Sequence, residues 1–151
     1  MNIVTDIQQL RKPTVPATEA DDVALVADQL FGAMKEANGR GLAANQIGLG
    51  LSVFVMKRDQ YTPICIVNPE LVRKKGQQKR NERCLSLPGI SRVMNRPQIV
   101  KVKAHNQYWQ PVTYSFRGIE AACVCHEMDH LVGRLIIDCG GGSGLDKPLN
   151  K

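Results

Sequence analysis

One segment of the sequence has the residue types and spacing of a metal site, namely His126-Glu127-Met128-Asp129-His130. On a helix, residues four positions apart lie on the same face about one turn apart, so both imidazoles can reach one metal ion. Glu127 is placed to hydrogen-bond the water on that ion, which is the position of a general base. The alternative is a pair of surface histidines beside a solvated glutamate. Because two of only three histidines in the chain lie here, we expect a metal site.

A catalytic site of this kind needs a third protein ligand and one open position for water. Cys123 shares a helix face with His126, but it lies about 10 Å along the axis from His130, too far to join both imidazoles on one ion. Cys125 is rotated by roughly 100° from His126. We therefore expect both cysteines to be structural. Asp129 is expected to orient a histidine or to face water.

Cys84 lies in a second distinctive segment, Cys84-Leu85-Ser86-Leu87-Pro88, in which Pro88 and Gly89 interrupt regular structure. A lone thiol is most often a small buried hydrophobic group. The residues alone leave both interpretations of Cys84 open, a metal ligand and a packed side chain.

Two helices are predicted to flank the middle of the chain. Thr18 resembles a helix N-cap with Asp21 three residues later, and apolar residues then recur at helical spacing as far as Asn38-Gly39. The second helix runs from about Gly118 to near Gly133 and carries both histidines of the proposed site. Between them, the glycine-rich segment 39–48 is predicted to be a shaped loop.

The residues between the helices favour strands, because β-branched and apolar side chains recur in short runs. We expect strands at Leu51–Met56, Ile64–Val67, Ile99–Ala104 and Val112–Phe116, with the second closed by Asn68-Pro69. The predicted fold class is α+β, with mixed or antiparallel sheets packed around a central metal-binding H-E-x-x-H helix and an amphipathic helix before them.

Length and composition predict one soluble domain. The chain of 151 residues suits a single catalytic domain, which we place at 1–138, and the glycine-rich composition after it predicts a flexible tail at 139–151. No apolar run approaches the roughly 20 residues that span a bilayer, and the amino terminus lacks the features of a signal peptide. Five cysteines without the spacing of a secreted module also favour a cytoplasmic protein with free thiols.

The net charge of +6 is carried partly by Arg73-Lys74-Lys75 and Lys79-Arg80, which we interpret as a solvated loop. No RNA-binding signature accompanies these residues, and aromatic residues make up only 5% of the chain. We expect at most weak attraction to ribosomal RNA, with no DNA or membrane partner.

Three segments together resemble the signature segments of peptide deformylases. They are Gly41-Leu42-Ala43-Ala44-Asn45-Gln46, Cys84-Leu85-Ser86-Leu87-Pro88 and His126-Glu127-Met128-Asp129-His130, in this order. Further similar features are Asn68-Pro69-Glu70, Val93-Met94-Asn95-Arg96 and His130-Leu131-Val132-Gly133, so the resemblance covers most of residues 18–138. The ordered triple is specific, whereas H-E-x-x-H alone is shared with unrelated metalloproteases.

The resemblance implies removal of the formyl group from the N-terminal formyl-methionine of new proteins, with release of formate. It also assigns site residues: Cys84, His126 and His130 as metal ligands, Glu127 as general acid and base, Gln46 and the backbone N–H of Leu85 as the oxyanion hole, and Gly41 as a substrate-binding residue. One divalent ion is expected, Fe²⁺ in the cell, while Zn²⁺, Ni²⁺ or Co²⁺ can occupy the same ligands in purified protein. The expected form is a monomer in a bacterial or viral-host cytoplasm, or in an organelle, with weak ribosome association.

Two features concern the Cys84 segment directly. The family usually has glycine before this cysteine, and the chain has Arg83, which we expect to lie in solvent or to pair with an acidic group of the substrate. Glu82 and Arg96 match family positions that interact, so an ion pair supporting Cys84 is expected.

Two other functions remain open at this point. A zincin-type metallopeptidase would share His126, Glu127 and His130 but take its third ligand from an acid or a histidine downstream. A non-catalytic, metal-stabilised ribosome-binding protein would not need Glu127.

Overall fold

The amphipathic helix expected after Thr18 begins at Val23 in the computed structural model, which describes residues 2–58 and 62–139. The prediction of Thr18 as its N-cap is wrong, because Asp22 caps this helix (α2, Val23–Glu36) by accepting a hydrogen bond from the N–H of Leu25 at 3.1 Å. Thr18 instead forms a separate turn, in which its N–H donates to Asp21 at 2.8 Å. The predicted stop near residue 38 is confirmed.

The strands form two antiparallel sheets within the described residues. The larger sheet has the order β1-β2-β3-β6-β7, with β1 at Gly41–Ala43, β2 at Val53–Met56, β3 at Ile64–Lys75, β6 at Ile99–His105 and β7 at Pro111–Arg117. The smaller sheet is a ribbon of β4 (Gln78–Arg83) and β5 (Ser91–Arg96). Together with the helices these sheets confirm the α+β class.

Strand β3 does not end at Asn68-Pro69, and the prediction that it closes there is wrong. The register of β3 against β6 shifts between Val67 and Glu70, which is a β-bulge that lets pairing resume as far as Lys75. Asn68 has a φ of 52°, and its side chain exchanges two hydrogen bonds with the backbone of Ala17, at 2.8 and 2.9 Å. The two basic runs therefore lie in strands β3 and β4 instead of a solvated loop.

The glycine-rich segment was predicted as a loop, but it forms strand β1 and a 3-10 helix, η1 (Ala44–Ile47). Leu42 pairs with Val55 of β2, so the backbone of this segment is held by the sheet. The Gln46 side chain then accepts a hydrogen bond from the N–H of Ala43 at 2.9 Å, which fixes the turn from strand to helix.

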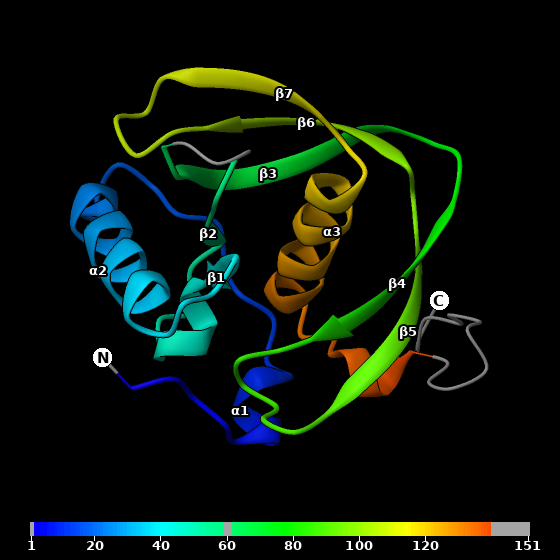
Figure 1. Ribbon diagram of the computed structural model, residues 1–151. Coiled ribbons are helices and arrows are strands. Elements are labelled where there is room, and N and C mark those ends of the chain that lie inside the picture. Colours follow the sequence, from blue (N-terminus) through cyan, green and yellow to red (C-terminus); the bar gives the residue numbers. More distant parts are fainter. Residues whose placement is uncertain (1, 59–61, 140–151) are drawn as a thin grey trace.

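The two long helices cover opposite faces of the sheet, and α3 (Ile119–Leu131) lies in the middle of the molecule (Figure 1). Alternate residues of β2 explain this arrangement, since side chains in a strand point to opposite faces. Val53 and Val55 pack with α2, whereas Phe54 and Met56 pack with α3. The H-E-x-x-H helix is therefore central, as predicted.

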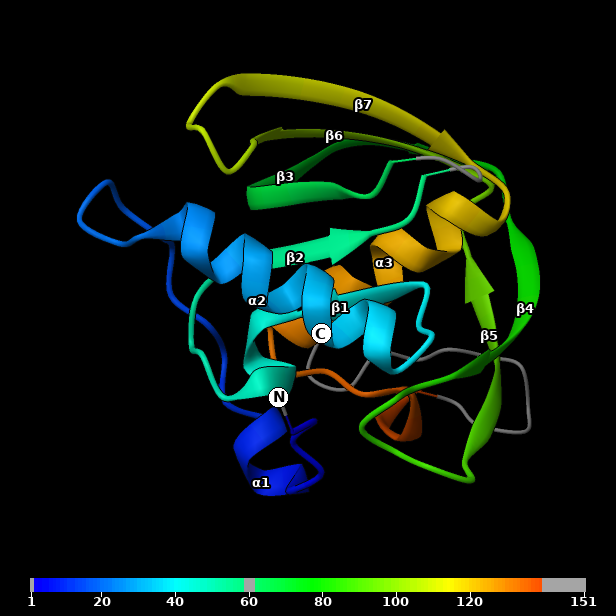
Figure 2. The same ribbon diagram turned by 60° about the vertical axis from the view of Figure 1, so that its left-hand side comes forward.

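A third hydrophobic cluster joins the two ends of the described chain to the turn between β4 and β5. It includes Leu10 of the short helix α1 (Ile7–Leu10) and Ile136 of the 3-10 helix η2 (Ile136–Asp138), neither of which was predicted. Figure 2 shows α1 and the segment after α3 on the same side of the molecule as this turn. Cys84 belongs to this cluster, so its position is set by packing between distant parts of the sequence.

The end of α3 is tied to the amino-terminal segment at Gly133. This glycine has a φ of 78°, and a Cβ there would lie 2.2 Å from the carbonyl oxygen of Arg11, so a side chain does not fit. Cys139, which we placed at the start of the tail, is buried, and residues 140–151 of the predicted tail lie outside the described residues. None of the described helices is long and apolar enough to cross a bilayer.

Candidate metal centre

Cys84, His126 and His130 come together in the structure, and their three potential ligand atoms all lie within 4.8 Å of one another. The two histidines project from the same face of α3, with ring centroids 5.0 Å apart. Cys84 is the first residue after β4, and its Sγ lies 3.3 Å from Nε2 of His130. In a tetrahedral site, sulfur and nitrogen ligands at their usual bond lengths lie about 3.5 Å apart. The donor set therefore fits a zinc-like or ferrous ion.

The turn that carries Cys84 is formed locally. The N–H of Leu87 donates to the carbonyl of Cys84 at 3.0 Å, and the N–H of Ile90 donates to Leu87 at 3.1 Å. Pro88 and Gly89 lie inside this turn, as their sequence predicts, and Gly89 has a φ of 80° that favours glycine.

Glu82 orients His126 from the neighbouring strand β4. Its Oε1 lies 2.9 Å from Nδ1 of His126, which leaves Nε2 of that ring to face a metal ion. The sequence did not predict this contact. The expected ion pair between Glu82 and Arg96 is present, with two contacts of 2.8 Å, and Arg96 also bonds Asp129 at 2.8 Å. Asp129 thus acts on the site through Arg96.

Burial acts on the pKa values of Glu82, His126 and His130. It raises the pKa of Glu82, but the hydrogen bonds from Arg96 and His126 outweigh it, and the pKa falls to about 2. Burial lowers the pKa of His130 well below its usual value, which favours the neutral form that binds metal. For His126 burial acts in the same direction, but Cys84 and Glu82 raise its pKa well above the usual value. The protonated form of His126 is therefore favoured in the metal-free protein.

Glu127 lies on α3 between the two histidines and is only 3% exposed. Burial raises the pKa of its carboxyl to about 7, a value suited to accepting and returning a proton near neutrality. Within the described part of the chain, no group donates a hydrogen bond to its Oε1, nor does any bond Nδ1 of His130. An unpartnered buried carboxylate oxygen is unfavourable where it serves structure alone, so Glu127 is a candidate for a chemical role.

Gln46 and Leu85 both lie next to Cys84. Nε2 of Gln46 is 3.1 Å from Oγ of Ser86 and 3.6 Å from Sγ of Cys84, so its amide is held beside the thiol. Leu85 follows Cys84 directly and lines the same cavity. Ser86 was not predicted as a site residue, and only its contact with Gln46 reveals it.

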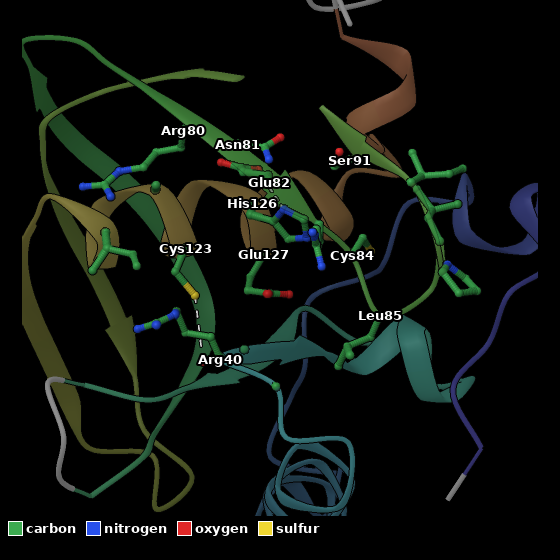
Figure 3. A pocket seen from close by; sticks show the side chains of 18 of the residues that line it. Arg40, Arg80, Asn81, Glu82, Cys84, Leu85, Ser91, Cys123, His126 and Glu127 are labelled. Carbon is green, nitrogen blue, oxygen red and sulfur yellow. Dashed lines mark hydrogen bonds and ion pairs between the residues drawn. The ribbon is translucent and has the colours of Figure 1, made fainter. Parts of the chain in front are cut away.

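Gln46, Cys84, Leu85, His126 and Glu127 line a cavity of about 860 Å³, and Figure 3 shows Cys84, His126 and Glu127 together at its centre. Gly41 forms part of the wall, and a Cβ there would lie 2.7 Å from Oε2 of Glu127. Gly41, which we expect to bind substrate, therefore lies directly against the Glu127 carboxylate.

Two cysteines that we expected to be structural lie outside the group of ligand atoms. Cys123 lines the cavity beside Arg40, and burial raises the pKa of its thiol well above the usual value, so the thiol is neutral. Cys125 packs against the cluster between α3 and the sheet. Arg83 is exposed on β4 and lines the cavity.

Comparison with known proteins places this architecture in a family. The family model described as polypeptide deformylase matches residues 1–142. The peptide deformylase of Aquifex aeolicus (strain VF5) is 40% identical over 135 residues, which cover 85% of this chain and 80% of that protein.

Two solved structures have the same fold. The peptide deformylase of Legionella pneumophila has a TM-score of 0.85 and 35% identity, covering 91% of this chain and 83% of that one. The deformylase of the Vibrio parahaemolyticus bacteriophage VP16T, in complex with actinonin, has a TM-score of 0.85 and 33% identity, covering 90% of this chain and 100% of that one.

Proposed function

The chain belongs to the peptide deformylase family, and we propose that it removes the formyl group from N-terminal formyl-methionine with one divalent metal ion bound by Cys84, His126 and His130. The observation that carries this proposal is the approach of Sγ of Cys84 to Nε2 of His130, at 3.3 Å. A thiolate from the β4–β5 turn joins two imidazoles from α3, and no other group of three such ligands occurs in the described residues.

A bound divalent ion supplies a Lewis acid and lowers the pKa of a coordinated water molecule. We propose Fe²⁺ as the ion in the cell, as the family resemblance implies, and the ligand set of one sulfur and two nitrogens also accepts Zn²⁺, Ni²⁺ or Co²⁺.

Glu127 is the proposed general base and acid. Its raised pKa, about 7, lets the carboxylate take a proton from the attacking water and return it to the departing amine at neutral pH. Glu127 lies between the two histidines on α3, so it would be close enough to exchange a proton with a water molecule on an ion that Cys84, His126 and His130 held. The unpartnered Oε1 is the atom available for that proton.

Gln46 and the backbone N–H of Leu85 are the proposed oxyanion hole. Oε1 of Gln46 is already fixed by the N–H of Ala43, which points its Nε2 toward Cys84. Donors held in advance of the reaction stabilise the developing negative charge without reorganisation, and the loss of one donor typically lowers turnover by about 100- to 1,000-fold.

The substrate peptide is proposed to bind in an extended conformation along strand edges. Gly41 of β1 and Asn81 of β4 both line the cavity, and each belongs to a strand at the edge of its sheet. An added peptide strand would gain backbone hydrogen bonds there. We further propose a cytoplasmic monomer that associates weakly with ribosomes through its positive charge.

The test is a deformylation assay on formyl-Met-Ala-Ser with protein loaded anaerobically with Fe²⁺ or Ni²⁺. The unmodified protein should release formate, and Glu127→Ala should reduce the rate by about 100- to 10,000-fold, the usual contribution of a general base. Glu70→Ala, on the exposed part of β3, is the matched control and should retain the rate. No turnover by either loaded form of the unmodified protein would overturn the proposal.

A further inference from the structure

Four basic residues line the cavity, and we call them its basic wall although they lie on more than one side; three of them come from one strand. They are Arg40, which precedes β1, and Lys79, Arg80 and Arg83 of β4. Figure 3 shows the side chains of Arg40 and Arg80 on either side of Cys123, both extending away from His126. Ile119 and Ala122 of α3 line the cavity near Cys123. This part of the cavity thus has an apolar floor and cationic sides.

The acids that line the cavity do not pair with these cations within the described residues. Of the carboxylates that line the cavity, Glu82 already accepts hydrogen bonds from Arg96 and His126, and Glu127 is almost fully buried. Arg80 donates to the neutral amide oxygen of Gln78 at 2.6 Å, which holds the guanidinium in place but leaves its charge. In the described parts of the chain, none of the four basic residues forms an ion pair.

Successive side chains of β4 point to opposite faces of the strand, so its basic residues face two directions. Arg80 and Glu82 are half-buried and point toward α3, whereas Lys79 and Arg83 are exposed on the other face of β4 and also line the cavity. A peptide in the cavity therefore meets cations along β4 and beside Cys123. Like charges held together repel one another, and an anionic ligand would relieve that repulsion.

We propose that this enzyme prefers formyl-methionyl peptides with an aspartate or glutamate at the second or third position, and that Arg40, Arg80 and Arg83 supply the selectivity. This inference rests on the proposed deformylase function. A nascent chain has no free carboxyl terminus, so acidic side chains are the groups of an extended substrate that can match a cationic wall. The preference acts on binding and leaves the chemical roles of Glu127 and Gln46 unchanged.

The experiment compares three peptides with amidated carboxyl termini, formyl-Met-Asp-Ala, formyl-Met-Asn-Ala and formyl-Met-Lys-Ala. A second set of three peptides carries the same variable residue at the third position instead of the second. Since exposed charges interact weakly and several act together here, kcat/KM should favour the aspartate over the lysine peptide by about 3- to 30-fold at low salt. The ratio should shrink at about 0.5 M salt, because the interaction is screened.

Substitutions of single basic residues test which of them cause the preference for acidic peptides. Arg80→Gln and Arg83→Gly should each bring the aspartate-to-lysine ratio toward one, and the exposed Arg83 keeps the test valid if Arg80→Gln folds poorly. Lys103→Gln, which removes an exposed cation from β6 outside the cavity lining, should leave the ratio unchanged.

Two outcomes separate this inference from the function on which it rests. Equal turnover of the three peptides, or an equal loss of the preference in Lys103→Gln, would overturn the inference and leave the deformylase function intact. If no peptide is turned over, the proposed function fails, and calorimetric binding of the same peptides still decides whether the cavity prefers acidic ones.

Discussion

Oε1 of Glu82 lies 2.9 Å from Nδ1 of His126, and the same oxygen lies 2.8 Å from Nη2 of Arg96. Because Arg96 fixes the carboxylate, the carboxylate in turn fixes the plane and the tautomer of the imidazole. One ion pair on the β4–β5 ribbon therefore orients a side chain of α3 toward the proposed metal site.

This relationship predicts that Glu82→Gln will weaken metal binding. The amide is a weaker and uncharged acceptor, so His126 becomes a poorer ligand, and affinity should fall by about 10- to 100-fold. Competition with a chromophoric chelator measures the change. Glu70→Gln is the control on an exposed strand position. Unchanged affinity in Glu82→Gln would mean that α3 alone orients the ring.

Cys84→Ser should affect the metal more strongly. A serine hydroxyl stays protonated near neutral pH and is a poor ligand for a soft ion. The loss of metal affinity should therefore exceed the roughly 10- to 100-fold that is typical when a residue that only hydrogen-bonds a ligand is replaced. Metal content after dialysis and deformylase activity should both fall, while Cys125→Ser should change neither. Full metal content in Cys84→Ser would favour the zincin alternative.

Gly41→Ala should lower turnover without unfolding the protein. The new Cβ would lie 2.7 Å from Oε2 of Glu127 and 3.0 Å from Sγ of Cys123, so the carboxylate must move. A displacement of about 1 Å can reduce catalysis by about 100-fold. Gly50→Ala is a matched control, since nothing lies within 4 Å of its Cβ position. Equal rates for the two variants would show that the Glu127 carboxylate tolerates the shift.

The metal-free protein should become less stable as pH rises from about 4.5 to 7 through the ionisation of Glu127. Burial raises the pKa of this carboxyl from 4.5 to about 7, so between these values the folded state holds a proton that the unfolded state has released. The stabilisation is complete below pH 4.5 and lost above pH 7.

Glu127→Gln removes this dependence. At about pH 8 the metal-free variant should be more stable than its parent by up to about 3 kcal/mol, and the difference should vanish toward about pH 4.5. Urea unfolding at several pH values measures both quantities. A variant that is no more stable at the higher pH would show that the Glu127 charge is already compensated in the folded state.

The sequence alone predicted the two long helices, most of the central strands and the shared face of His126 and His130 on α3. These predictions depend on local periodicity: His126 and His130 must share a face once the segment is helical. The ordered motifs also indicated the family, which the comparisons confirm.

The tertiary structure alone decided how the other elements reach that helix. The length of β3 depends on a bulge that the Asn68 side chain stabilises from Ala17, and the position of Cys84 depends on packing with Leu10 and Ile136. Such contacts join residues far apart in the chain, and local propensity carries no information about them. The contact of Glu82 with His126 and the basic wall of the cavity arise in the same way, because both require β4 to lie across α3.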